Sequence, residues 1–202
     1  MATKTYLALA QQAGAGRVEL VQLDTASSAS IQACVDGLKG KLGHLDVVVN
    51  NAGVIDSLGP FEQVTEKELL DCFQTNTIGP FLFTQELKRA GLIGTPGGPS
   101  VVANISSILG SIGTDIFAAY PGYAYRMSKA ALNSMTRYVD IALAQEGISL
   151  VSIHPGYVKT DINQGEGDIT AEESVRGILQ VLESGKDLHG RFYSWAGDEL
   201  PW

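Results

Sequence analysis

The stretch "LDVVVN" at residues 45–50 decides the fold, because it is a continuous apolar run of strand length. A strand that is apolar on both faces is typical of a parallel sheet covered by helices on both sides. Comparable runs follow at 100–105 ("SVVANI") and 148–153 ("ISLVSI"), and β-rich segments lie at 17–23 ("RVELVQL") and 191–195 ("RFYSW"). We expect these segments to be the strands of a mostly parallel sheet.

Helical patterns separate the strand-like runs. "TEKE" at 65–68 and "TAEE" at 170–173 are capping boxes that predict helix starts. The first of these helices is expected to be interrupted near Gly79-Pro80 and to resume through Lys88, because proline removes a backbone donor. A further helix is predicted over 123–145. The apolar positions expected on helix faces are Ile31, Cys34, Val35, Leu38 and Leu42, then Leu69, Leu70 and Phe73, and finally Val175, Ile178, Leu179 and Leu182.

Strand–helix alternation without repeats or a linker predicts one α/β domain over residues 1–202. In such sheets ligands bind beyond the carboxyl ends of the strands. Polar clusters stand at these expected ends: Asp24, Asn50-Asn51, Ser106-Ser107 and the loop at 154–161. Turn residues also collect there for structural reasons, so the clusters alone favour a binding site only modestly.

Composition excludes several classes of protein. The 202 residues are 45% hydrophobic and carry a formal net charge of -8, which argues against nucleic acid or an anionic membrane as a partner. No apolar run approaches the ~20 residues of a membrane span, and no signal-peptide pattern opens the chain. Cys34 and Cys72 are interpreted as buried thiols of a reducing compartment, so a cytoplasmic location is expected. No set of residues has metal-ligand spacing, and no metal is predicted.

The stretch "YAYRMSK" at 123–129 carries the candidate chemistry. Tyr125 stands four residues before Lys129, so the two side chains share a helix face. A nearby ammonium is expected to lower the pKa of a tyrosine, which could then exchange a proton with a carbonyl or alcohol oxygen. The alternative is an ordinary solvated helix face. Tyr123 lacks a lysine four residues on and is interpreted as pocket wall or packing.

The surrounding motifs favour the proton-transfer interpretation of Tyr125 and Lys129 over a solvated helix face. "NNAG" (50–53), "NISSILGSIG" (104–113), "YAYRMSKAALN" (123–133) and "HPGYVKTD" (154–161) follow in a fixed order, and the chain ends in "GRFYSWAGDELPW". This joint pattern resembles the short-chain dehydrogenase/reductase family, and within it the C-factor/sniffer group of carbonyl-reductase-like members. The resemblance covers about 17–202 and implies a Rossmann-like fold.

The resemblance also implies catalytic roles. Tyr125 would be the general acid/base, and Lys129 would lower its pKa and hydrogen-bond the nicotinamide ribose. Ser107 would orient the substrate oxygen, and Asn76 would hold a water in a proton relay. For Asn76 the open alternative is that it satisfies backbone groups freed by the helix interruption.

The implied cofactor is NAD(P), with NADP favoured. Asp24 would meet the adenine. The residues implied to line the adenosine side and brace the sheet are Asn50, Asn51, Ala52 and Gly53, and those implied to hold the carboxamide end are Pro155, Gly156, Val158 and Thr160. Glycine at 53 and 156 would let the backbone approach a flat cofactor closely.

The chain departs from the family at its start. A glycine-rich turn between the first strand and helix normally cradles the cofactor pyrophosphate. The nearest candidate here, "AGAG" at 13–16, precedes "RVELVQLD", which by register is the family's third strand. We therefore expect an N-terminally truncated fold, without its first two strands and first helix.

Two functional hypotheses follow. In the first, the chain is an oxidoreductase that transfers hydride between NAD(P)(H) and a small-molecule carbonyl or secondary alcohol. In the second, it is a catalytically silent relative that acts as an interaction or dimerisation partner. Apolar residues between Ser107 and Tyr125 favour an apolar or aromatic carbonyl compound: Ile112, Ile116, Phe117 and Tyr120. The resemblance further implies a homodimer or homotetramer, formed through the helices that carry Asn76 and Tyr125.

Overall fold

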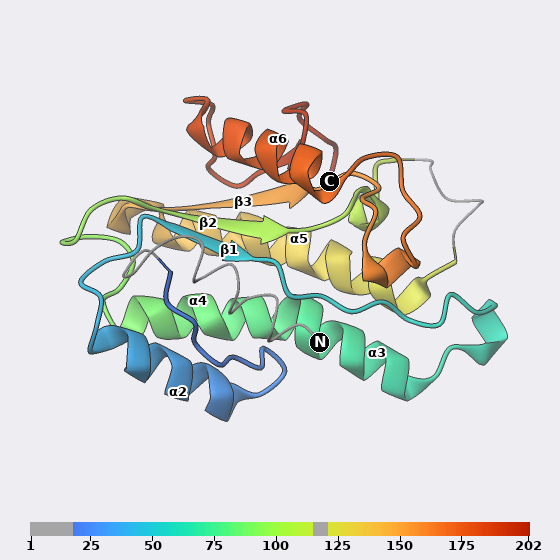
Figure 1. Ribbon diagram of the computed structural model, residues 1–202, viewed down its shortest axis with the longest axis horizontal. Helices are drawn as coiled ribbons and strands as arrows, with labels where there is room; N and C mark the ends of the chain where they lie inside the picture. Colours follow the sequence, from blue (N-terminus) through green and yellow to red (C-terminus); the bar gives the residue numbers. More distant parts are fainter. Residues whose placement is uncertain (1–17, 115–120) are drawn as a thin grey trace.

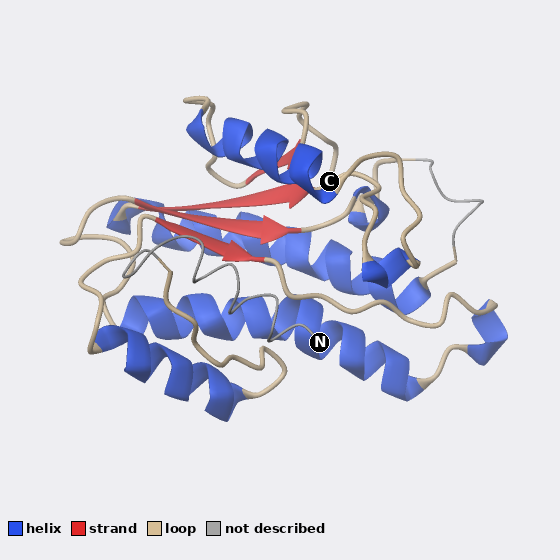
Figure 2. Cartoon of the chain, viewed as in Figure 1, coloured by secondary structure: helices blue, strands red, loops and turns tan. Residues whose placement is uncertain are grey.

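A single parallel sheet organises the part of the chain that the computed structural model describes, residues 18–114 and 121–202. Its strands are β1 (Val47–Asn50), β2 (Ser100–Ile105), β3 (Ile148–His154) and β4 (Arg191–Ser194). They lie side by side in chain order, and each neighbouring pair is parallel. Figure 2 shows the strands pointing the same way among the helices. The predicted α/β class is confirmed.

Helices connect the strands much as the sequence predicts. The helices are α2 (Ser28–Lys39), α3 (Glu66–Phe73), α4 (Gly79–Arg89), α5 (Tyr123–Leu143) and α6 (Ala171–Glu183). Both capping boxes are present, at Thr65 with Glu68 and at Thr170 with Glu173. The expected interruption is confirmed as a π-helical segment, η2 (Gln74–Ile78), which ends directly before Gly79-Pro80.

Apolar side chains pack on both faces of the sheet. On one face, Val102 and Leu150 belong to a cluster with side chains of α2, α4 and α5. On the other, Ala103 and Val151 pack with Ile178 and Val181 of α6. Figure 1 shows α6 on one side of the strands, opposite α2 and α4. Alternation along the strands feeds both layers, as expected when helices cover both faces of a sheet.

Two predictions about the strands are wrong. Residues 18–23 of "RVELVQL" form no strand, and Val18, Leu20, Val21 and Leu23 are exposed. The "LDVVVN" run is not buried on both faces, because Val47 and Val49 are about half exposed. Val49 pairs with Ala103 and so lies on the face of the sheet that α6 covers, but it is not part of the cluster that packs with α6. In the described residues β1 is an edge strand that pairs only with β2, and segment 18–23 does not pair with its outer edge.

The buried face of α6 also differs from the predicted set. Val175 and Leu179 are exposed, whereas Ser174 and Gly177 face the sheet beside Ile178 and Val181. A Cβ on Gly177 would come within 2.4 Å of the Trp195 carbonyl oxygen. The helix therefore packs through its smallest residues, since these allow its backbone to approach β4 closely.

Candidate active site

The carboxyl ends of three neighbouring strands gather the motifs at one edge of the sheet. Asn50 pairs with Asn104, and Ile105 pairs with Ile153, so β1, β2 and β3 end nearly level. "NNAG", Ser106-Ser107 and the segment from His154 therefore leave the sheet together. This is the edge where ligands bind in parallel α/β sheets.

A buried polar network fixes the ends of these strands. Asn50 donates its side-chain amide to Asn104 at 2.8 Å, and Asn104 donates to the Thr136 hydroxyl at 2.9 Å. Ser152 donates to the same hydroxyl at 3.0 Å. The network joins β1, β2, β3 and α5, and each buried polar group has a partner, as folded proteins require. The bracing role expected for Asn50 fits these contacts.

Tyr125, Lys129 and Ser107 come together at the end of β2. The Lys129 Nζ lies 5.6 Å from the centre of the Tyr125 ring and donates a hydrogen bond to the Ile105 carbonyl at 2.7 Å. Ser107 acts on Tyr125 by lowering its pKa, and the Ser107 Oγ accepts from the Leu109 N–H at 3.2 Å. Lys129 is buried on the inner face of α5. The α5 helix thus places Tyr125 and Lys129 together next to Ser107.

Burial dominates the electrostatics of this group. It raises the pKa of Tyr125 above its usual value, against the opposing effect of the Ser107 side chain. The expectation that Lys129 lowers this pKa is therefore not met, because desolvation disfavours the phenolate more than the neighbours stabilise it. Burial also lowers the pKa of Lys129 to about 8. At neutral pH the tyrosine is a neutral proton donor next to a lysine that is easily deprotonated.

Asn76 lies within η2 and is fully buried. Its side-chain amide donates to the Val54 carbonyl and the Ser128 hydroxyl, both at 2.9 Å, and accepts from the Val54 N–H at 2.9 Å. These bonds tie the "NNAG" segment to α5. The backbone groups that it satisfies belong to Val54 in the segment after β1, and not to the helix interruption named in the alternative. A Cβ on Gly53 would lie 3.3 Å from the Asn76 Oδ1 and 3.7 Å from the Lys129 Nζ.

Four of the five residues expected on the adenosine side are at least partly accessible, whereas Asn50 is buried. Asp24, Asn51 and Ala52 are exposed, and Gly53 is partly exposed. The Asp24 carboxylate accepts from the Ala26 N–H at 3.0 Å, which fixes the turn into α2. Asp24 and the "NNAG" segment thus leave polar and backbone groups open to a ligand.

The loop after β3 is shaped by its own packing. Gly156 has a φ of 86°, and a Cβ there would meet the Ile169 side chain at 2.6 Å. The Pro155 carbonyl accepts from the Ser174 hydroxyl at 2.6 Å. Thr160 bonds Asn163 at 3.0 Å, and Val158 forms a bridge to Ile169. Glycine at 156 is therefore demanded by the turn itself, whether or not a cofactor lies against it.

The residues present fit one end of a nicotinamide dinucleotide. Lys129 uses one of its ammonium hydrogens on Ile105 and keeps others for a ribose hydroxyl. Gly53 lies next to this ammonium, and any side chain at position 53 would occupy the space between them. For the pyrophosphate, residues 18–114 and 121–202 supply no glycine-rich turn between a strand and a helix.

Sequence reasoning missed the residue that caps α5. Asp56 is buried, and its Oδ2 accepts from the Ala124 N–H at 3.1 Å. The helix begins after Gly122, which has no side chain to perform this task. A carboxylate at a helix N-terminus is favoured by the exposed N–H groups and the helix dipole. No local pattern could reveal the contact, because its partners are 68 residues apart.

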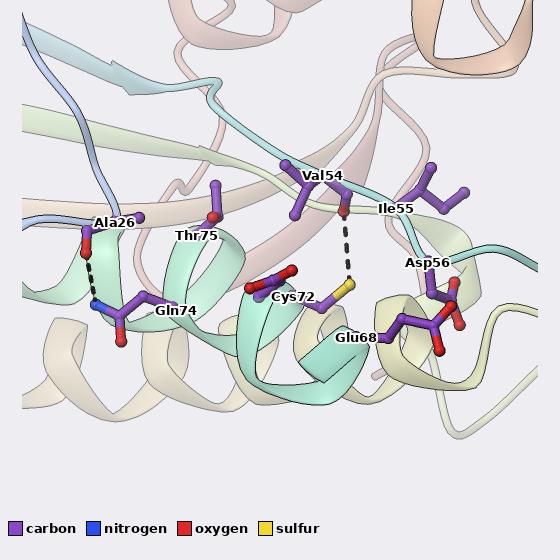
Figure 3. A pocket seen from close by; sticks show the side chains of 9 residues that line it. Ala26, Val54, Ile55, Asp56, Glu68, Cys72, Gln74 and Thr75 are labelled. Atoms are coloured by element: carbon purple, nitrogen blue, oxygen red, sulfur yellow. Dashed lines mark hydrogen bonds between the residues drawn. The ribbon is translucent and has the colours of Figure 1, made fainter. Parts of the chain in front are cut away.

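A pocket of about 230 Å³ is lined mainly by the segment that follows "NNAG" and by α3. Figure 3 shows Val54, Asp56, Glu68 and Cys72 around it, with the Cys72 Sγ 3.9 Å from the Val54 carbonyl oxygen. None of Asn76, Ser107, Tyr125 or Lys129 lines this pocket. It is therefore separate from the candidate active site. Burial, together with the nearby Asp56, raises the pKa of the Cys72 thiol to about 11.

Two further classes of site are absent from the described part of the chain. No helix there is long and apolar enough to cross a membrane. No group of three or more histidine, cysteine or acidic residues within 18–114 and 121–202 could hold a metal ion. Cys34 and Cys72 are buried free thiols, as expected.

A parallel sheet with Ser107, Tyr125 and Lys129 at its carboxyl edge has the arrangement expected of a short-chain dehydrogenase. The chain matches the short chain dehydrogenase family over residues 2–170, and it belongs to that family. C-signal of Myxococcus xanthus is 37% identical over 161 residues, covering 79% of this chain and 94% of that protein. The short-chain dehydrogenase srdF of Neurospora crassa is 33% identical over 197 residues, covering 91% of this chain and 76% of its own length.

Solved structures support the same assignment. The NADPH-bound carbonyl reductase from chicken fatty liver aligns with a TM-score of 0.89 and 31% identity, covering 98% of this chain and 82% of that chain. Carbonyl reductase Sniffer of Drosophila melanogaster aligns with a TM-score of 0.85 and 30% identity, covering 98% and 83%. The likeness to the C-factor/sniffer group and the Rossmann-like fold are thereby confirmed.

Proposed function

We propose that this chain acts as an NAD(P)(H)-dependent oxidoreductase on a small carbonyl compound or secondary alcohol, with residues 1–202 forming one catalytic domain. The observation that carries the proposal is the convergence of Ser107, Tyr125 and Lys129 at the end of β2. NADPH in the chicken carbonyl reductase and NADP in a Burkholderia multivorans relative of 27% identity favour NADP as the cofactor.

In the proposed reduction, Tyr125 donates its phenolic proton to the substrate oxygen, and Ser107 donates a hydrogen bond to the same atom. The bound nicotinamide supplies the hydride. Donors aimed at an oxygen that becomes negative stabilise the transition state more than the ground state. The raised pKa of Tyr125 keeps it protonated at neutral pH. Lys129, whose pKa is about 8, lies close enough to help restore that proton and holds the ribose.

The cofactor would occupy the sheet edge between two groups of residues. Asp24, Asn50, Asn51, Ala52 and Gly53 would line its adenosine side. The carboxamide end would meet the β3 loop, through Pro155, Gly156, Val158 and Thr160. Asn76 would hold the "NNAG" segment in place and keep a water in the proton relay.

Tyr125→Phe tests the acid/base role. The variant removes only the hydroxyl, and carbonyl reduction should fall by at least about 100-fold, the range of a lost general acid. Tyr123→Phe is the matched control, since Tyr123 is exposed and packs edge-on against Phe61. Unchanged reduction by Tyr125→Phe would remove the tyrosine from the mechanism.

The proposed partner is a second copy of the chain. An apolar groove runs along α4 and α5, and Ile78, Phe81 and Tyr138 are exposed in it. The groove also borders η2, which carries Asn76, and the resemblance implies a homodimer or homotetramer through the helices that carry Asn76 and Tyr125. Tyr138→Glu should shift the chain towards monomer in sedimentation analysis, because it places a charge in the buried centre of such an interface.

A further inference from the structure

The end of the chain is bonded to the segment that follows Ser107. The Ile112 and Gly113 N–H groups donate to the main-chain oxygen of Trp202 at 2.9 and 2.7 Å. The Ser111 hydroxyl donates to the Pro201 carbonyl at 2.7 Å. Three consecutive residues thus direct donors at Pro201-Trp202, which lies about 90 residues further along the chain.

Trp202 is itself anchored on the sheet. Its ring stacks on Phe192 with centroids 5.6 Å apart and planes inclined by 21°. Phe192 belongs to β4 and is almost fully buried, so it is a rigid platform. A Cβ on Gly113 would lie 3.1 Å from both Pro201 and the Trp202 oxygen, which shows how closely the two segments meet. The indole therefore fixes the position of the oxygen that the 112–113 amides use.

The other end of the 108–113 segment controls the serine. Its first residues form the short helix η3 (Ile108–Gly110), and Ser107 caps it by accepting from the Leu109 N–H. Gly110 packs directly on α5, where a Cβ would lie 2.7 Å from the Lys129 carbonyl carbon. The same Ser107 side chain acts on Tyr125 by lowering its pKa. A displacement of 111–113 would therefore reach the catalytic hydroxyl through η3.

We propose that Trp202 is a positioning residue: its stacking on Phe192 holds the 111–113 segment, which fixes η3 and so orients the Ser107 hydroxyl towards Tyr125. This inference rests on the proposed oxidoreductase function of the site. It predicts that the end of the chain affects chemistry at Ser107 without contacting substrate or cofactor.

The test compares Trp202→Ala with Trp202→Phe, which keeps a stacking ring. The control is Val175→Ala, at an exposed position on α6. In Trp202→Ala we expect faster amide exchange at Ile112, Gly113 and also Leu109. The kcat for carbonyl reduction should fall about tenfold or more, since small misplacements are costly, while the cofactor Kd stays within about twofold. Trp202→Phe should restore most of the amide protection and most of the kcat.

Unchanged Leu109 exchange in Trp202→Ala, or an unchanged kcat in an active enzyme, would overturn the proposal. A readout independent of turnover separates it from the proposed function. Moving Ser107 away from Tyr125 should remove its lowering effect and so raise the pKa of Tyr125, which NMR of a ring-labelled tyrosine would follow. If the wild-type chain is inactive, a raised Tyr125 pKa in Trp202→Ala supports the positioning role, and an unchanged pKa refutes it.

Discussion

Gly110→Ala should disturb the candidate site through packing alone. Gly110 is the last residue of η3 and is buried against α5, and its φ does not lie in the left-handed region, so alanine fits the backbone. The added Cβ would lie 2.7 Å from the Lys129 carbonyl carbon, 2.8 Å from the Lys129 Cβ and 2.9 Å from the Ala130 nitrogen. These are backbone or near-backbone atoms that cannot rotate away. The two elements must therefore separate.

The size of the effect follows from this geometry. Ordinary contact begins near 3.4 Å, so η3 must move by about 0.7 Å from α5. Overpacking of this kind costs about 1–3 kcal/mol. For a chain of this length the melting temperature should fall by roughly 2–12 °C. Because Ser107 and Lys129 lie on opposite sides of the contact, carbonyl reduction should fall by about 10- to 100-fold.

Gly37→Ala is the matched control. Gly37 lies in the exposed part of α2, and a Cβ there meets no atom within 4 Å. It should stabilise the fold by about 0.5–1 kcal/mol, because alanine is the better helix former, and leave activity unchanged. Urea unfolding followed by circular dichroism measures both variants. The packing account is refuted if Gly110→Ala is as stable as the wild type within about 0.5 kcal/mol.

Three further predictions concern buried groups. Asp140→Ala should cost about 1–3 kcal/mol in urea unfolding, because it removes the acceptor of the buried Leu150 N–H at 2.8 Å; wild-type stability would contradict this. Between pH 8 and 10.5 the unfolded chain binds the Lys129 proton more tightly than the folded chain does. The free energy of unfolding should therefore rise by about 3 kcal/mol across this range, compared with Lys129→Met, which has no such proton. Parallel pH profiles of the two proteins would refute this prediction. The Cys72 thiol, with its pKa near 11, should resist a disulfide reagent at neutral pH until the chain unfolds, whereas rapid labelling would show that it is accessible.

Local patterns predicted much of the scaffold. β2 has the expected bounds, both capping boxes form, and the helix interruption stands beside Gly79-Pro80. Each of these depends on residues close together in sequence. The neighbourhood of Ser107, Tyr125 and Lys129 also followed from motif order, because parallel strands end at one edge.

Long-range effects could not be predicted in the same way. Segment 18–23 has strand composition but does not pair with the edge strand β1, and Val49 is about half exposed although its neighbours are covered by α6. The direction of the Tyr125 pKa shift depends on how deeply the fold buries it. Asp56 and Trp202 act on partners far away in sequence, so no spacing rule could identify them. The predictions for "AGAG" at 13–16 and for Ile116, Phe117 and Tyr120 concern residues outside the described part of the chain.

The most direct test of the account is a titration of NADPH and NADH with the purified chain, followed by cofactor fluorescence. We expect saturable binding that prefers NADPH and that weakens in Gly53→Val, whose side chain would fill the space beside Asn76 and Lys129. Gly37→Ala should bind as the wild type does. Failure to bind either cofactor near millimolar concentration would contradict the oxidoreductase proposal and favour a silent interaction partner.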